Sequence, residues 1–143
     1  MIPSRLLAAS AMLLLATVAA AGEMPAGDAT AGAGIFRKCA ACHHIDRDEK
    51  KIGPSLMGVI GRQAGSWDGF RYSPAMVEAG ANGLVWSPDV LFEYLIKPRD
   101  YIKGTRMAFP GLPSEQDRAD VIAYILQSSD PSAKAGTPSA SGD

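Results

Sequence analysis

Five consecutive residues, Cys39-Ala-Ala-Cys42-His43, constrain this 143-residue chain more than any other stretch. Cys39 and Cys42 are the only cysteines, and His43 and His44 are the only histidines. Cysteines three apart close almost no loop, so a disulfide between them would stabilise the fold very little. The gathering of all four side chains in one short segment therefore indicates a common chemical task.

The spacing within this motif is that of covalent c-type haem attachment. Two thiols one helical turn apart lie on the same helix face, and each can add to one haem vinyl group. The imidazole of His43 follows directly and can ligate the iron. A thioredoxin-like motif would need a βαβ setting, a structural zinc site would need four tetrahedral ligands, and a chance match is the third alternative. The motif predicts one haem c, bound through Cys39 and Cys42.

The first 21 residues have the pattern of a cleaved secretory signal. Arg5 precedes an apolar run from Leu6 to Ala21, which ends in small residues. This run has 16 residues, fewer than the roughly 20 needed to span a bilayer, although a retained anchor is the alternative. Cleavage near Ala21 predicts an exported protein without stable membrane insertion. The mature chain would keep 13 basic and 15 acidic residues, a net charge of −2 that does not suggest nucleic-acid binding.

The remaining chain divides into a linker at 22–27, a domain at 28–127 and a tail at 128–143. The tail is rich in Ser, Ala, Gly and Pro without apolar periodicity, so we expect it to be disordered. Within the domain, two long Gly/Pro-rich stretches at 50–70 and 103–113 are predicted to be loops that wrap a ligand.

Helix signals are stronger than strand signals in this domain. Asp28 and Ser114 are predicted N-caps, and Ser73-Pro74 and Ser87-Pro88 combine an N-cap with Pro at the first helical position. Predicted ends are Gly80 for the second helix and Pro98 for the third. The sequence predicts an all-α fold with three to five short helices and functional loops.

A second axial ligand for the iron has to come from elsewhere, or the position stays open for chemistry. The predicted mature chain offers four methionines: Met24, Met57, Met76 and Met107. Most methionines simply fill cores. Met107 differs because it lies in a loop punctuated by Gly and Pro, 64 residues after His43, from which it can reach the opposite haem face.

Several segments in order resemble those of class I cytochromes c, the small soluble proteins of mitochondria and the bacterial periplasm. They are "GDATAGAGIFRKCAACH", "GPSLMGVIGRQAG", "GFRYSPA", "LVWSPDVLFEYLIKPRDYIKGTRMAFPGL" and "RADVIAYIL". The resemblance covers nearly the whole domain. It implies the cytochrome c fold, with long loops wrapped around one covalently bound haem, and close packing of Gly32 against the helix that contains Val121 and Tyr124.

The resemblance also implies roles for particular residues. His43 and Met107 would be the axial ligands, the Pro54 carbonyl would orient His43, and Tyr94 would lie beside the methionine sulfur. Four further positions match residues at or near the haem propionates: Arg62, Tyr72, Trp86 and Thr105. Taken without the resemblance, the aromatic residues would be ordinary core and Arg62 a surface cation.

Two departures from the family pattern stand close to these positions. Met76 replaces a residue that is often Asn, which makes a polar position apolar. Arg99, Asp100 and Arg106 stand where the mitochondrial type has lysines near the methionine loop. Arginine stays protonated and cannot replace a methionine on iron.

The resemblance implies a monomeric, periplasmic one-electron carrier that is not an enzyme. It would shuttle between a quinol–cytochrome c reductase or other donor and a terminal oxidase or reaction centre. Redox partners would dock at a local basic face: Arg37, Lys38, Lys50, Lys51, Lys97, Arg99, Lys103 and Arg106. The alternatives are a haem peroxidase or gas-binding module, and a dedicated electron acceptor of a periplasmic dehydrogenase.

Overall fold

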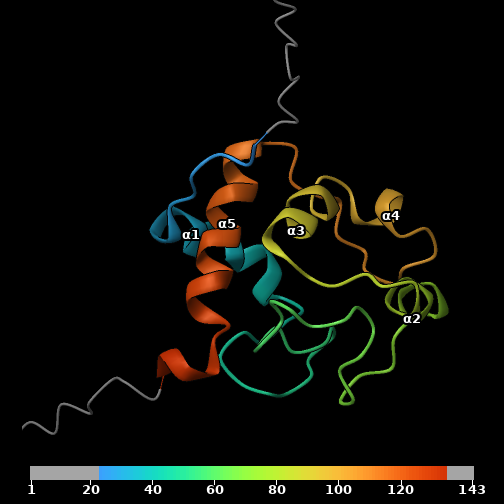
Figure 1. Cartoon of the computed structure of the whole chain (residues 1–143). Coiled ribbons are helices and arrows are strands. Elements are labelled where there is room, and N and C mark those ends of the chain that lie inside the picture. The colour runs from blue at the N-terminus through green and yellow to red at the C-terminus, as the bar shows by residue number, and fades with distance from the viewer. Residues whose placement is uncertain (1–22, 135–143) are drawn as a thin grey trace, which may run out of the picture.

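Residues 23–134 are the part of the chain that this computed structural model describes, and their regular structure is helical (Figure 1). The elements in this range are α1 (Ala29–Ala40), α2 (Pro74–Ala81), α3 (Pro88–Tyr94), α4 (Pro98–Tyr101), α5 (Glu115–Ser128) and the 3₁₀ helix η1 (Pro131–Lys134). The all-α prediction is confirmed. The predicted signal at 1–21 lies outside the described residues, as does the end of the predicted tail.

Four helices begin at the predicted N-caps. The side chains of Asp28, Ser73, Ser87 and Ser114 each accept a hydrogen bond from a backbone N–H in the first turn. These bonds satisfy donors that the helix itself leaves unpaired, and each typically contributes about 1 kcal/mol. Local sequence therefore determines where these helices start.

One predicted helix end is wrong, and another is one residue short of the observed end. The third helix ends at Tyr94, and Pro98 instead occupies the first turn of α4, a helix that the sequence patterns did not predict. The second helix continues through Gly80, where an added Cβ would lie 1.9 Å from the Ala64 carbonyl oxygen. Glycine is required there for a close backbone approach, not to end the helix.

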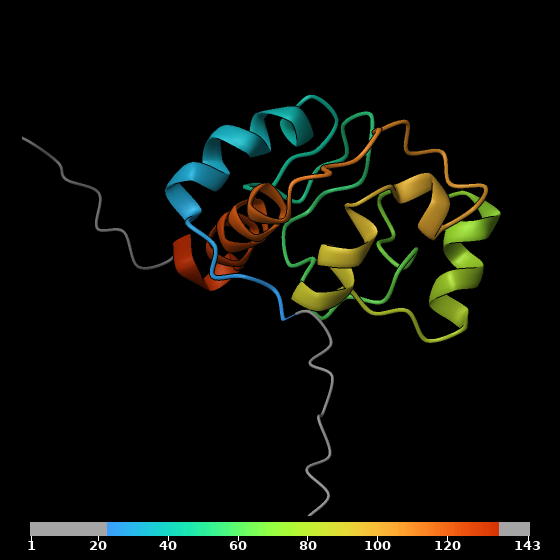
Figure 2. The same cartoon turned by 90° about the horizontal axis from the view of Figure 1, so that it is seen from above.

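The first and last helices pack against each other on one side of the molecule (Figures 1 and 2). A Cβ at Gly32 would lie 1.9 Å from the carbonyl oxygen of Asp120 and 2.9 Å from the Cβ of Tyr124. The rings of Phe36 and Tyr124 meet four residues further along, with centroids 5.0 Å apart. The expected close approach at Gly32 is confirmed, and it brings the two ends of the domain together.

The predicted linker and tail border this helix pair. Gln116 Nε2 donates to the Ala26 carbonyl at 3.0 Å, and the backbone N–H of Asp28 donates to Asp120 Oδ1 at 2.8 Å. At the other end, the predicted boundary between 127 and 128 falls in the last turn of α5. Residues on both sides of the predicted domain boundaries thus contact the helices.

The shorter helices α2, α3 and α4 lie on the other side, joined by long loops (Figure 2). The buried guanidinium of Arg118 connects the two sides. It donates from one nitrogen to the carbonyls of Leu112 and Pro113, and it lies 4.4 Å from the ring centre of Phe92 in α3. Within residues 23–134, none of the helices combines the length and apolar character needed to cross a membrane.

Candidate haem-binding site

A mainly apolar cavity of about 630 Å³ lies between the end of α1, α2, α3 and the long loops. Its volume falls within the roughly 300–1,000 Å³ that is usual for cofactor sites. All ten predicted site residues line it: Cys39, Cys42, His43, Pro54, Arg62, Tyr72, Trp86, Tyr94, Thr105 and Met107. Residues far apart in the sequence therefore meet around one space, as a wrapped cofactor requires.

The last turn of α1 brings Cys39 to this cavity, and the turn that follows the helix brings Cys42. The backbone N–H groups of Cys42 and His43 both donate to the Cys39 carbonyl at 3.0 Å, so the chain turns tightly after the helix. Burial raises the pKa of a free Cys39 thiol to about 11, opposed by the nearby charge of Lys38. The two sulfurs and the following imidazole line the same cavity, which suits covalent attachment beside an axial ligand.

The His43 ring is held in one orientation. Its Nδ1 donates to the Pro54 carbonyl at 2.7 Å, which leaves Nε2 as the nitrogen with a free lone pair. A Cβ at Gly53 would lie 2.5 Å from the ring carbon Cε1, so only glycine leaves room for the ring. Burial lowers the pKa of His43, against the opposing effect of the Pro54 bond. A neutral, oriented imidazole is the form that binds a metal.

Met107 comes to the same cavity from the loop at 103–113. Tyr94 donates from its hydroxyl to the Met107 sulfur at 3.1 Å, and the Met107 backbone N–H donates to Thr105 Oγ1 at 3.3 Å. Burial raises the pKa of Tyr94 to about 12, so the phenol remains protonated and able to donate near neutral pH. The Trp86 ring packs against it, with centroids 4.8 Å apart. Together these contacts hold the thioether at the cavity.

Arg62 supplies a partly buried positive charge at another wall. It donates to the Ser55 carbonyl at 2.6 Å and to the Met57 carbonyl at 3.3 Å. Burial lowers the pKa of Arg62 and raises that of the neighbouring Tyr72, while the proximity of the two groups opposes both shifts. These carbonyl acceptors carry no full negative charge, so a carboxylate such as a haem propionate fits beside Arg62.

Most of the remaining wall is apolar. Apart from Met76, which the resemblance already placed beside the haem, its residues were not predicted to belong to the site. It includes Leu56, Val59, Leu91, Leu95 and Ile125, together with the Met76 sulfur side chain. Their apolar periodicity is the same as that of ordinary core residues, so no sequence signal separates the two roles. A flat, largely apolar macrocycle with acidic edge groups fits this wall and Arg62.

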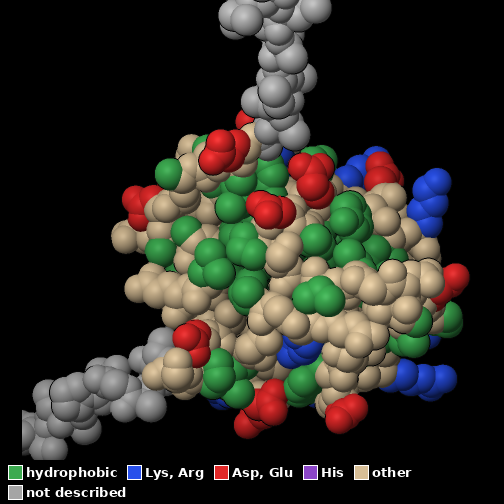
Figure 3. All heavy atoms as spheres, in the orientation of Figure 1, with side chains coloured by type: hydrophobic (Ala, Val, Ile, Leu, Met, Phe, Trp, Pro, Cys, Tyr) green, Lys and Arg blue, Asp and Glu red, His purple; other side chains and the backbone are tan. Residues whose placement is uncertain are grey.

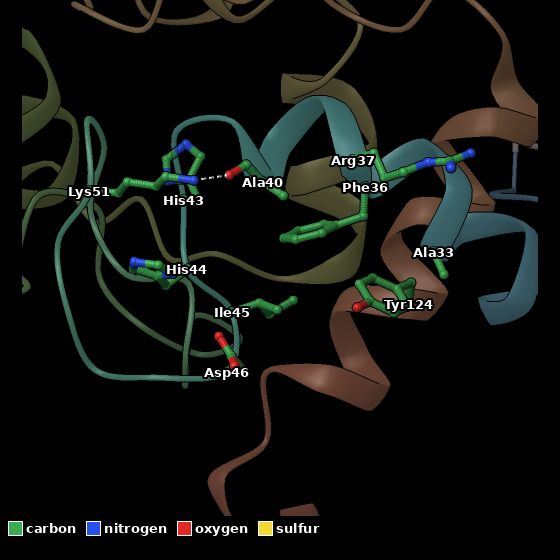
Figure 4. A pocket seen from close by; sticks show the side chains of 10 residues that line it. All are labelled: Ala33, Phe36, Arg37, Ala40, His43, His44, Ile45, Asp46, Lys51 and Tyr124. Atoms are coloured by element: carbon green, nitrogen blue, oxygen red, sulfur yellow. Dashed lines mark hydrogen bonds between the residues drawn. The ribbon is translucent and has the colours of Figure 1, made fainter.

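The second histidine lies elsewhere. His44 lines an open hollow of about 420 Å³ behind the His43 segment, bordered by Arg37, Lys51 and Tyr124 (Figure 4). Lys51 Nζ donates to the Ala40 carbonyl at 2.7 Å in this region. His44 is half-buried there, away from the set of residues that lines the larger cavity.

The predicted basic residues differ in their surroundings. Lys38 and Arg106 are at the edge of the large cavity, whereas Arg37 and Lys51 border the second hollow. Lys97 pairs with Asp100 at 2.9 Å. On the face in Figure 3, Lys and Arg side chains project at the right-hand edge with acidic side chains between them, and other acidic side chains are scattered over the rest of the face. The predicted residues thus do not all surround one opening.

Comparisons with known proteins agree with this geometry. The family described as "Cytochrome c" matches residues 29–129. Cytochrome c of Gossypium barbadense is 45% identical over 108 residues, covering 74% of this chain and 95% of that protein. Cytochrome c2 of Rhodopila globiformis is 44% identical over 105 residues, with 73% and 96% covered. The structure of cytochrome c2 from Rhodospirillum centenum is similar with a TM-score of 0.68 at 40% identity, over 72% of this chain and 99% of that one.

Proposed function

This chain belongs to the cytochrome c family, and on that premise we propose that its one covalently bound haem c is held between the His43 imidazole and the Met107 thioether. The family consists of electron carriers and not of enzymes, and this chain shares that role. The single observation that carries the ligand proposal is the cavity lined by both side chains together with both cysteines.

The surroundings of the two ligands support a closed iron site. When bound, the haem supplies an iron that exchanges one electron between its ferric and ferrous states. Pro54 accepts the ring N–H of His43 and makes the imidazole a better donor. Tyr94 donates to one lone pair of the Met107 sulfur and leaves the other for the metal. With His43 and Met107 holding the iron, a substrate would have no coordination position to enter.

The cavity wall favours the reduced form. Leu91, Leu95 and Ile125 form an apolar wall, and such a low-dielectric surrounding would disfavour the extra positive charge of ferric haem. Thioether ligation raises the reduction potential in the same direction. Arg62, Tyr72, Trp86 and Thr105 are proposed to surround the propionates. This pattern supports electron transfer over the peroxidase or gas-binding alternative, which needs an open position.

We also propose a compartment and redox partners for this chain. Export and removal of the leader near Ala21 would place a monomer in the periplasm. There it would carry electrons from a quinol–cytochrome c reductase or other donor to a terminal oxidase or reaction centre. Lys38 and Arg106 at the cavity edge support docking beside the haem, because they offer positive charge where the electron leaves or enters.

Electron transfer with an acidic reductase should slow as salt increases. Charges around the cavity edge steer the encounter, so the bimolecular rate should fall on the order of tenfold from low to about 0.5 M salt. Stopped-flow reduction of the holoprotein by purified quinol–cytochrome c reductase measures this slope. Lys38→Gln should flatten the slope.

Arg47→Gln is the matched control, because Arg47 lies outside the proposed face and pairs with Asp46 at 3.4 Å. It should leave the slope near that of the unaltered protein. A rate that is independent of salt would exclude this docking face, and so would equal slopes for the two variants.

A further inference from the structure

Two arginines hold the segment that carries Met107. Arg99 Nε donates to the Met107 carbonyl at 3.3 Å. Arg106 Nη1 donates to the Arg71 carbonyl at 3.4 Å, and this bond joins residues 35 positions apart in the sequence. The first contact restrains Met107 itself, and the second ties its segment to the loop across the cavity edge.

The Arg99 contact starts from a well-anchored element. Pro98 begins α4 and is fully buried, so the helix cannot shift without exposing it. An ion pair of 2.9 Å joins Lys97, the residue before this short helix, to Asp100 within it. Arg99 therefore reaches the Met107 carbonyl from a fixed position, although the bond itself is exposed.

The Arg106 contact spans the cavity edge. Arg71 immediately precedes Tyr72, and both residues line the cavity, as does Arg106 from the opposite segment. Gly104 has φ +95°, which lets the chain turn just before Thr105 and Arg106. A bond between the two loops at this point resists outward movement of the Met107 segment, in which Arg106 and Ala108 are exposed and Met107 is half-buried.

We propose that Arg99 and Arg106 are positioning residues that set how readily Met107 leaves the iron. This inference rests on the proposed His43/Met107 ligation. Each bond is long and exposed, so each is individually weak, but both act directly on the short segment that carries the thioether. The guanidinium groups stay charged to high pH and do not ligate iron, so they restrain the segment without competing for the metal.

Imidazole binding to the ferric holoprotein tests this role. In excess imidazole the observed rate reaches a plateau that reports departure of Met107. Arg106→Gln and Arg99→Gln should each raise this plateau by roughly three- to tenfold, as expected for loss of one weak hydrogen bond. Arg106→Lys and Arg99→Lys keep a charged donor and should restore most of the restraint. The assay is run near pH 7, where the new lysine amine stays protonated and does not ligate iron. A variant that had lost its fold would show no such recovery.

Arg71→Gln is the matched control. It removes an equal charge at the same cavity edge but keeps the backbone carbonyl that accepts from Arg106. Its plateau should stay within about twofold of that of the unaltered protein, since a single exposed charge contributes little. Plateaus that agree for all variants would overturn the proposal. An increase for Arg71→Gln equal to that for Arg106→Gln would overturn it too, because charge alone would then be the cause.

The absorption band of methionine bound to ferric iron shows which proposal has failed, the role of the two arginines or the underlying His43/Met107 ligation. If the band is present and the arginine variants bind imidazole at the original rate, only the arginine role fails. If the unaltered protein lacks the band and binds imidazole without a plateau, the His43/Met107 ligation fails and the arginine role falls with it.

Discussion

Substitution of Met107 by Ala should lower the reduction potential of the holoprotein by on the order of 0.2 V. Axial ligands tune haem potentials over roughly 0.8 V, and a thioether stabilises the ferrous state relative to water. The variant should also lose the absorption band of methionine bound to ferric iron. A potentiometric titration followed by visible spectroscopy measures both changes in one sample.

Met76→Leu is the matched control for this prediction. Met76 is the other methionine that lines the cavity, and leucine keeps its apolar volume at a usual cost below about 1.5 kcal/mol. The band should persist in Met76→Leu. Loss of the band in Met76→Leu and its retention in Met107→Ala would show that Met76 is the sixth ligand and would contradict the proposed role of Met107.

Gly32→Ala should destabilise the protein by about 3 kcal/mol or more. The new Cβ would lie 1.9 Å from the Asp120 carbonyl oxygen, which belongs to the backbone of α5 and can move only if the helices separate. Overpacking at rigid contacts costs about 1–3 kcal/mol and sometimes more. For a domain of this size, the melting temperature should fall on the order of 10–20 °C. Thermal and denaturant unfolding of the holoprotein measure the loss.

Gly34→Ala provides the control on the same helix. Its Cβ would meet only Arg37 Nη2, at 3.7 Å, on an exposed face. Alanine favours helix over glycine by roughly 0.5–1 kcal/mol, so this variant should be slightly more stable. Equal stability of Gly32→Ala and the unaltered protein would contradict the close crossing of α1 and α5.

The two cysteines and His43 could be predicted as site residues because they act together within one short segment. Cys39, Cys42 and His43 are adjacent in sequence, and an N-cap at Asp28 already implies a helix that delivers them together. Likewise, Ser and Pro residues at the other helix starts act within one turn. Interactions over so few residues leave a direct signature in the sequence.

The opposite half of the site was only partly predictable without the resemblance, because the Gly/Pro-rich loop favoured Met107 but nothing local indicated its neighbours. Met107 was one of four candidate methionines, and Tyr94 could equally have been ordinary core. Their contact at 3.1 Å depends on how α3 and a distant loop pack, which no periodicity encodes. Residues far apart in sequence therefore needed a known relative, or the fold itself, to be brought together.

Other features of the fold could not be predicted from local sequence preferences. Pro98 was interpreted as a helix end, although the same proline also favours the first turn of a helix as short as α4. Trp67 Nε1 donates to Asp48 Oδ1 at 2.8 Å across 19 residues and joins two loops. Arginine is usually found at the protein surface, but Arg118 is buried and its guanidinium lies over the ring of Phe92. Each of these depends on tertiary packing that overrides local preference.

Exposure of the ferrous holoprotein to carbon monoxide tests the central claim most directly. With His43 and Met107 both bound to iron, carbon monoxide finds no free position, so the visible spectrum should stay that of a low-spin ferrous haem at neutral pH. A rapid shift to the spectrum of a carbon monoxide complex would contradict the closed site and favour a gas-binding or peroxidase function.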